Sequence, residues 1–390
     1  VEVHTPTSDW RVTIELPEAT LPVQLHLAPD GSYAWFINGA ERVRVPIVEK
    51  SEGRWTLRFP AFNNTVVLDQ VGDRLEGQLT LVKRGYEQVM NLQAAPDPGY
   101  RFNQSPEPEI DVTGRWEVIF TEDDGTEGIA VAEFDQQGAV LTGTFLTPKG
   151  DYRYLAGDVD GDTLHLSTFD GAHAFVFTAT AQADGTLAGD FWSGTKWHES
   201  WTAKRNFDAK LPDAYALTYL KDGYDRLEFS FPDLEGNPVS LDDEKYRDKV
   251  VLVSLAGTWC PNCGDETEYL SAYYRENRDR GLEIITLLYE HFRDFETAAV
   301  QGRAFAEKYD IGFDVLVAGY SDKQEAAATL PMINHVLAYP TLIFIDRNGD
   351  VRQIHTGFTG PGTGQYFEDF KTGFTSAMDA LLAETGGEIR

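Results

Sequence analysis

The stretch that decides the fold of the C-terminal part of the chain is VVLVSLAGTWCPNC, residues 250–263. A continuous apolar run of this length is typical of a strand that is covered on both faces of a sheet. Cys260 and Cys263 follow this run directly, and residues 264–280 after them have the composition of a helix. The stretch therefore predicts a buried strand, a short loop that carries both cysteines, and a helix that begins near them.

The same alternation of apolar strands and helices continues to the C-terminus and predicts an α/β domain over residues 215–390, with a central sheet covered on both faces. The other expected strands are 282–289, 313–318 and 341–346, and the other expected helices are 295–310, 323–330 and 368–384.

The first half of the chain has a different pattern. Short segments in which polar and apolar residues alternate, such as RVTIEL and RWEVIF, are separated by turn residues. This pattern predicts two all-β domains, 1–98 and 107–206, each a meander of about eight strands. The stretch 96–111 is rich in proline and polar residues, which suit neither a helix nor a sheet ladder, so it is expected to be a linker.

The two β domains share internal landmarks. DW (9–10) in the first block corresponds to RW (115–116) in the second, and LEGQLT (75–80) corresponds to LAGDFW (187–192). The simplest account is an internal duplication of a unit of roughly 100 residues.

The edge strands of a meander of this size must be paired or protected. The sheet can close into an up-and-down barrel, or two sheets can stack as a sandwich. Gly114, Trp116 and Arg205 resemble, in spacing and position, the first-strand G-x-W and the late arginine of lipocalin-like barrels, where the arginine stacks on the tryptophan. This resemblance favours the barrel, and the sandwich stays open.

The chain is strongly acidic. It has 63 Asp and Glu against 33 Lys and Arg, a formal net charge of −30, which disfavours nucleic acid and anionic membrane surfaces as partners. No stretch approaches the ~18 to 20 consecutive apolar residues of a membrane span, so no transmembrane segment is expected. The first residue is Val1, which a processed or trimmed N-terminus would explain.

Cys260 and Cys263 are the only cysteines in the sequence. A thiol at a helix N-terminus has a lowered pKa and becomes a nucleophile near neutral pH. A disulfide that closes so short a loop adds little stability, which argues against a structural staple. A structural zinc site needs four ligands, and the sequence has no second cysteine pair. These points favour a redox pair over a staple or a metal site, with no metal and no further cofactor.

Residues 229–378 resemble the TlpA-like or ResA-like group of extracytoplasmic thiol-disulfide oxidoreductases. The resemblance rests on W-C-x-x-C, on FSFPDLEGNPVSL (229–241) and on AYPTLIFIDRNGD (338–350). It is strong over about the last 150 residues, partial over 107–206 and faint over 1–106. It implies a thioredoxin-like fold for the α/β domain and disulfide exchange with protein substrates.

The resemblance also implies roles for single residues. Cys260 would be the attacking thiol, and Cys263 would resolve the mixed disulfide. Tyr339-Pro340 would be the cis-proline corner beside the pair, where the exposed backbone of Tyr339 pairs with an extended substrate.

Glu266 lies three residues after Cys263, where the ResA-like group has a buried glutamate. Burial would raise its pKa and suit it to move the proton of Cys263. Ser254 occupies the strand position at which thioredoxins carry a buried aspartate, so Glu266 is the better candidate for this role. The alternative is a solvated glutamate that favours the helix dipole.

The residues around the pair are expected to form the substrate surface. Trp259 would shield the thiols and line that surface, and Pro261 and Asn262, between the cysteines, would set the redox poise. His291, after the second strand of the domain, is a weaker candidate.

The favoured hypothesis is an oxidoreductase that is periplasmic or otherwise extracytoplasmic. A lipid anchor before processing is compatible with this location. The protein would act on protein disulfides in the reductive direction and be recharged by a membrane electron donor of the kind the family uses.

Two alternatives remain open. One is a ligand-binding protein whose β domains hold a ligand and whose CPNC pair is a redox sensor or partner anchor. The other is a thiol peroxidase, which needs a Thr or Ser three residues before its cysteine, where this sequence has Gly257.

Overall fold

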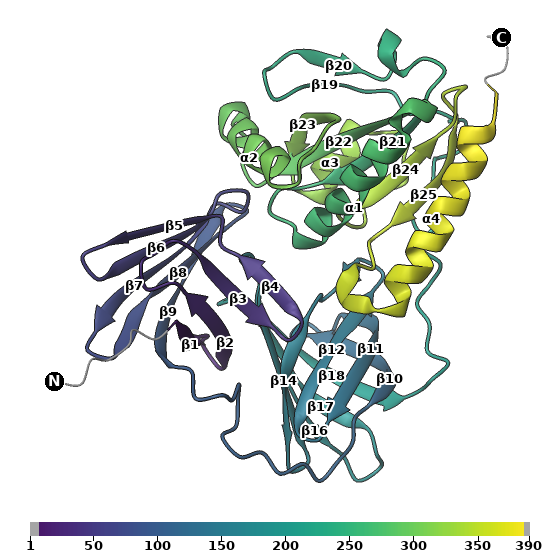
Figure 1. Cartoon of the computed structure of the whole chain (residues 1–390). Helices are drawn as coiled ribbons and strands as arrows, with labels where there is room; N and C mark the ends of the chain where they lie inside the picture. Colours follow the sequence, from purple (N-terminus) through teal and green to yellow (C-terminus); the bar gives the residue numbers. More distant parts are fainter. Residues whose placement is uncertain (1–7, 386–390) are drawn as a thin grey trace. The chain divides into compact units, whose positions relative to one another are not determined.

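The computed structural model describes residues 8–385 and divides the chain into two compact units (Figure 1). The β unit comprises Val1–Thr147 and Tyr152–Leu211, and the α/β unit comprises Pro148–Asp151 and Pro212–Arg390. Among the described residues, no helix combines the length and the apolar character needed to cross a membrane.

The first sheet of the β unit has nine antiparallel strands, where about eight were expected. Its strands are β1 (Asp9–Glu15), β2 (Thr20–Leu27), β3 (Ala34–Asn38), β4 (Glu41–Arg44), β5 (Ile47–Ser51), β6 (Arg54–Phe59), β7 (Asn64–Val71), β8 (Arg74–Lys83) and β9 (Tyr86–Pro96). The order is β4-β3-β2-β1-β9-β8-β7-β6-β5. The extra strand arises at Pro46, which has no backbone N–H for a ladder and separates β4 from β5.

Eight strands of the second, nine-stranded sheet close into a barrel, and the ninth strand, β13 (Gly150–Asp151), has only two residues. The strands of the barrel are β10 (Gly114–Glu122), β11 (Glu127–Gln137), β12 (Val140–Thr147), β14 (Leu155–Asp160), β15 (Thr163–Phe169), β16 (Ala174–Ala181), β17 (Leu187–Ser193) and β18 (Trp197–Arg205). β10 pairs with both β11 and β18, and β11 also pairs with β12, so the ladder has no free end. The Arg205 guanidinium lies 4.4 Å from the Trp116 ring centroid. The barrel is confirmed over the sandwich.

Aromatic side chains fill the interior of this barrel. Phe177 stacks on Phe145 at 4.6 Å and on Phe191 at 4.3 Å between ring centroids. Trp201 lies edge-on to Phe145 at 5.3 Å and is fully buried. An eight-stranded barrel is just wide enough for side chains to fill, and these rings occupy it as a packed core.

Partly buried charged side chains join the two sheets of the β unit. Arg101, in the proline-rich stretch between the sheets, donates hydrogen bonds to the carbonyl oxygens of Ile37 and Ser167. Arg153 forms ion pairs with Glu41 at 2.9 Å and with Asp170 at 3.1 Å. The stretch 97–113 has no named strand, but it is packed rather than a loose tether.

The α/β unit has a five-stranded mixed sheet of order β23-β22-β21-β24-β25. The strands are β21 (Val250–Ala256), β22 (Leu282–Glu290), β23 (Asp314–Tyr320), β24 (Thr341–Ile345) and β25 (Val351–Thr356). The helices are α1 (Pro261–Asn277), α2 (Phe295–Lys308), α3 (Lys323–Thr329) and α4 (Gln365–Ala383). All the expected strands and helices are confirmed, and β25 and the small hairpin β19 (Ser230–Pro232) and β20 (Pro238–Ser240) are additional.

Both faces of this sheet are covered, as expected. Leu270 of α1 and Phe374 of α4 pack with Leu252 of β21 in one core cluster. Ala326 of α3 packs with Val253 of β21 in the other. β21 is buried along its whole length. The loop with both cysteines follows its C-terminal end and is therefore held by the central sheet.

Candidate active site

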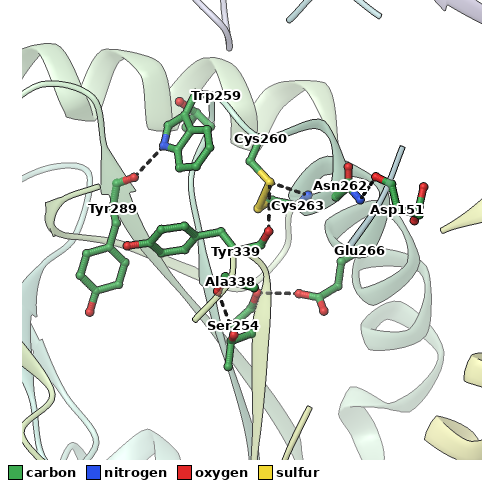
Figure 2. The surroundings of a disulfide bond; sticks show 12 residues. Asp151, Ser254, Trp259, Cys260, Asn262, Cys263, Glu266, Tyr289, Ala338 and Tyr339 are labelled. Carbon is green, nitrogen blue, oxygen red and sulfur yellow. Dashed lines mark hydrogen bonds between the residues drawn. A yellow bond between two sulfur atoms is a disulfide. The ribbon is translucent and has the colours of Figure 1, made fainter. Parts of the chain in front are cut away.

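Cys260 and Cys263 form a disulfide at the first turn of α1 (Figure 2). Their Cα atoms are 5.2 Å apart. Cys260 is the N-cap of the helix, and its sulfur accepts a hydrogen bond from the backbone N–H of Cys263 at 3.2 Å. Pro261 starts the helix, where its fixed φ suits the first turn and its missing N–H costs no intrahelical bond. The pair therefore faces the positive end of the helix dipole.

The disulfide is buried beside the predicted proline corner. Cys260 is 6% exposed and Cys263 is 0% exposed. The Tyr339-Pro340 peptide bond is cis, as expected, and the Tyr339 carbonyl oxygen lies 3.6 Å from the Cys260 sulfur. A disulfide sulfur carries no proton, so this is a contact in the oxidised pair. The same carbonyl is a ready acceptor for a Cys260 thiol.

Glu266 is fully buried below the pair, as expected, and is not a solvated helix residue. Ser254 of β21 donates a hydrogen bond of 2.7 Å to one carboxyl oxygen (Figure 2), and the other oxygen has no partner among the described residues. Burial raises the pKa of Glu266 to about 8, against the smaller lowering by Ser254. This value is close to that of an ordinary thiol, which suits proton exchange with a cysteine.

Trp259 lies on one side of the pair and is held by three neighbours. Its indole N–H donates to the Tyr289 carbonyl oxygen at 2.9 Å. Its ring stacks on His291 at 4.6 Å and meets Tyr339 edge-on at 5.6 Å. The predicted shielding residue is therefore fixed in place. His291, a weaker candidate, belongs to the site through this stacking.

The prediction missed Glu290, the last residue of β22. Its carboxylate accepts hydrogen bonds from the backbone N–H and the hydroxyl of Thr258, at 2.9 and 2.8 Å. Burial raises the pKa of Glu290 to about 7, against the lowering by these two bonds. Glu290 thus supports the loop just before Trp259. The only signal in the sequence is a charged residue that ends an apolar run.

The prediction also missed Asp151. This residue belongs to the α/β unit, although the rest of that unit begins only at Pro212. The side-chain amide of Asn262 donates a hydrogen bond of 2.9 Å to the Asp151 carbonyl oxygen. Figure 2 shows Asp151 on the side of the disulfide away from Trp259. Asn262, predicted to line the substrate surface, is buried.

These residues converge on one pair of sulfur atoms. Within residues 8–385, no group of three or more His, Cys, Asp or Glu side chains is placed to hold a metal ion. A closed C-x-x-C pair follows the central strand, caps a helix and faces a cis-proline. A fold and site of this kind define a redox-active protein of the thioredoxin class.

Known proteins agree with this class. A profile of the AhpC/TSA family matches residues 223–354. The thioredoxin-like protein YneN of Bacillus subtilis is 31% identical over 138 residues, which cover 35% of this chain and 73% of YneN. The thiol-disulfide oxidoreductase ResA of Geobacillus kaustophilus is 29% identical over 130 residues, which cover 33% of this chain and 66% of that protein. With YneN, the chain belongs to the thioredoxin-like proteins, and it is similar to the ResA thiol-disulfide oxidoreductases.

Among solved structures, the chain is similar to a thiol:disulfide interchange protein of the thioredoxin family from Chlorobium tepidum. The two are 17% identical, and the match covers 42% of this chain and all of that one, with a TM-score of 0.31. The thioredoxin domain of a thiol-disulfide oxidoreductase from Bacteroides vulgatus is 23% identical, with 39% of this chain and 99% of that one covered and a TM-score of 0.30.

Proposed function

We propose that the protein is an extracytoplasmic oxidoreductase that reduces disulfides in protein substrates. The observation that carries the proposal is the buried Cys260–Cys263 pair at the N-terminus of α1, with Glu266 buried one turn further along the helix. The helix end stabilises a thiolate, and Glu266 is placed to exchange a proton with the second cysteine.

The reductive reaction has two steps. First, the Cys260 thiolate attacks a substrate disulfide, forms a mixed disulfide and releases one substrate thiolate. Second, the Cys263 thiolate attacks the Cys260 sulfur, closes the pair and releases the second substrate thiolate. Two electrons pass to the substrate, and Glu266 takes the proton that Cys263 loses. Tyr339 and Trp259 would contact the substrate, and Pro340 would hold the backbone of Tyr339 toward it.

The enzyme must then be reduced again. A partner dithiol supplies two electrons and is itself oxidised to a disulfide, and we assign this role to a membrane electron donor. An extracytoplasmic location agrees with the cysteine content, because the sequence has no thiol beyond the pair that could mispair in an oxidising compartment.

Trapping the mixed disulfide tests this proposal. In Cys263→Ser the first step proceeds and the second cannot, so a covalent adduct with substrate proteins should accumulate and be released by a reducing agent. The matched control is Cys260→Ser, which should form no such adduct. If both variants trap the same proteins to the same extent, or neither traps any, the proposal is wrong.

The surroundings of Gly257 disfavour the thiol peroxidase alternative. A Cβ atom there would lie 2.2 Å from the Trp259 indole nitrogen, so the Thr or Ser that a thiol peroxidase needs has no room. The ligand-binding alternative is disfavoured inside the second β domain, because aromatic rings fill the barrel interior. Turnover of hydrogen peroxide far above that of a free thiol would restore the first alternative.

A further inference from the structure

A short segment from the first half of the chain is built into the redox site. Pro148–Asp151 lies in chain order between β12 and β14, yet it belongs to the α/β unit. Asp151 makes two hydrogen bonds there. Its carbonyl oxygen accepts from the side chain of Asn262 at 2.9 Å, and its carboxylate accepts from the backbone N–H of Gly360 at 2.8 Å.

The segment is fitted closely on both sides. Gly150 has φ +135°, and a Cβ atom there would lie 3.0 Å from the Asn262 side-chain nitrogen. Gly357 has φ +77°, and a Cβ atom there would lie 3.1 Å from the Pro148 carbonyl oxygen. Both positions therefore need glycine, for the backbone conformation and for the close approach. Asp151 itself is buried, so its two bonds are made away from bulk water.

We propose that Asp151 is a positioning residue of the redox pair, that it acts through Asn262, and that it stabilises the disulfide relative to the dithiol. This inference rests on the disulfide exchange proposed above. Asn262 lies between the two cysteines, on the first turn of α1. Breaking the S–S bond moves the sulfur atoms out to van der Waals contact, and the first turn must adjust. An anchored Asn262 opposes this adjustment, so the anchor favours the oxidised state in which it is observed.

The consequence is measurable in a glutathione redox buffer. The reduced protein transfers two electrons to oxidised glutathione, which yields the protein disulfide and two molecules of reduced glutathione. The equilibrium constant of this reaction reports the stability of the pair directly. A loss of overall stability that affects both redox states equally does not change it.

Four single variants of the full-length chain separate the possibilities. Asn262→Ala removes the donor, and Asp151→Ala removes the carboxylate that fixes the segment to Gly360. Each should shift the equilibrium toward the dithiol, by roughly fivefold if the loss is that of one net hydrogen bond. Asp151→Asn keeps an acceptor oxygen and should stay within about twofold of the unchanged protein. Asp162→Ala removes an exposed carboxylate in the turn between β14 and β15 and is the matched control, with no expected shift.

The double variant Asp151→Ala with Asn262→Ala tests the route of the effect. If Asp151 acts through Asn262, the double variant shifts the equilibrium no further than Asn262→Ala alone. Independent, additive shifts contradict this route. If both single variants exchange with glutathione as the unchanged protein does, and only their melting temperatures fall, Asp151 is structural and the inference fails. If the unchanged protein does not exchange with glutathione at all, the proposed function fails instead.

Discussion

The position, burial and raised pKa of Glu266 all suit it to exchange a proton with Cys263. It lies one turn after Cys263 on α1, is fully buried, and accepts a hydrogen bond from Ser254. Burial raises the pKa of Glu266 to about 8. This value lies near that of an ordinary thiol, so we expect proton transfer from a cysteine to Glu266 to have little thermodynamic cost.

Replacing Glu266 should therefore slow the second step of exchange. We expect Glu266→Gln to reduce the rate of resolution of a preformed mixed disulfide on Cys260 by about 100-fold near pH 7, the usual size of one acid-base contribution. The loss should shrink at alkaline pH, where Cys263 ionises without help. Stopped-flow detection of the released thiol measures this rate.

The matched control is Glu268→Gln, which removes an exposed carboxylate from the same helix. It should leave the rate of resolution unchanged. Equal slowing in both variants, or a Glu266→Gln defect that does not depend on pH, would show that Glu266 does not carry the proton.

The same carboxyl makes stability depend on pH. The pKa of Glu266 is raised from 4.5 to about 8 on folding, so the folded protein holds a proton that the unfolded chain has lost between these values. The free energy of unfolding must then fall as the pH rises from about 4.5 to about 8 and level off above this window. Glu290, with its pKa raised to about 7, acts in the same direction.

Urea unfolding at pH 5 and pH 8 measures this dependence. The loss of stability on raising the pH should be smaller in Glu266→Gln than in the unchanged protein, by on the order of a few kcal/mol, at about 1.4 kcal/mol per unit of pKa shift. An identical pH dependence in both proteins would mean that Glu266 is not protonated in the folded state.

The site residues differ in how far the sequence could predict them. Cys260, Cys263 and Glu266 share one helix start, so local spacing was enough to place them. Glu290 reaches the site through parallel pairing of β22 with β21, and its bond to Thr258 spans 32 positions. Asp151 reaches it across 111 positions, through a segment between two barrel strands. Contacts of this kind depend on tertiary structure and leave no local pattern.

At the scale of elements, we expect α1 to activate Cys260, the proposed nucleophile. The backbone N–H groups of its first turn have no partner within the helix, and that of Cys263 donates to the Cys260 sulfur in the oxidised state. A negative thiolate in this position is stabilised more than a neutral thiol. The pKa of Cys260 in the reduced protein should therefore lie below the ordinary value of about 8.5.

Alkylation of the reduced protein tests this effect of the helix. In Cys263→Ser, the rate of iodoacetamide reaction at Cys260 should follow a titration with its midpoint at least about one pH unit below 8.5. Cys263 in the Cys260→Ser variant is the internal comparison and should react more slowly, because it is 0% exposed. A midpoint at or above 8.5 for Cys260 would contradict activation by the helix.

Elements with a strong period or a long apolar run were predicted well. β21, β22 and the four helices of the α/β unit match the expected segments within a few residues. β25 was missed because VRQIHT is largely polar and pairs on one side only, with β24. The alternating pattern of residues 42–48 continues across Pro46, so the pattern alone predicts one strand where the structure has β4 and β5. Pairing partners, rather than composition, decide such edge strands.

At the scale of the whole molecule, we expect the net charge to affect which substrates the protein encounters fastest. Acidic side chains outnumber basic ones by 63 to 33, which gives a net charge of −30. A field of this sign raises the rate of encounter with cationic partners and lowers it with acidic ones. The effect should act on association and weaken as salt screens the charges.

Peptide disulfides of opposite charge test this effect. At low ionic strength, we expect an arginine-containing peptide disulfide to be reduced about tenfold faster than a glutamate-containing one of the same length. The difference should largely disappear at about 1 M salt, where the screening length falls to about 3 Å. Equal rates at low salt would show that the net charge does not govern substrate encounter.

The central claim is that the chain reduces disulfides through Cys260 and Cys263. The most direct measurement is multiple turnover of a self-quenched peptide disulfide by the full-length protein, with a dithiol reductant in excess. We predict that the unchanged protein accelerates cleavage well above the reductant alone and that Cys260→Ser abolishes the acceleration. Equal rates for the unchanged protein, Cys260→Ser and the reductant alone would contradict the claim.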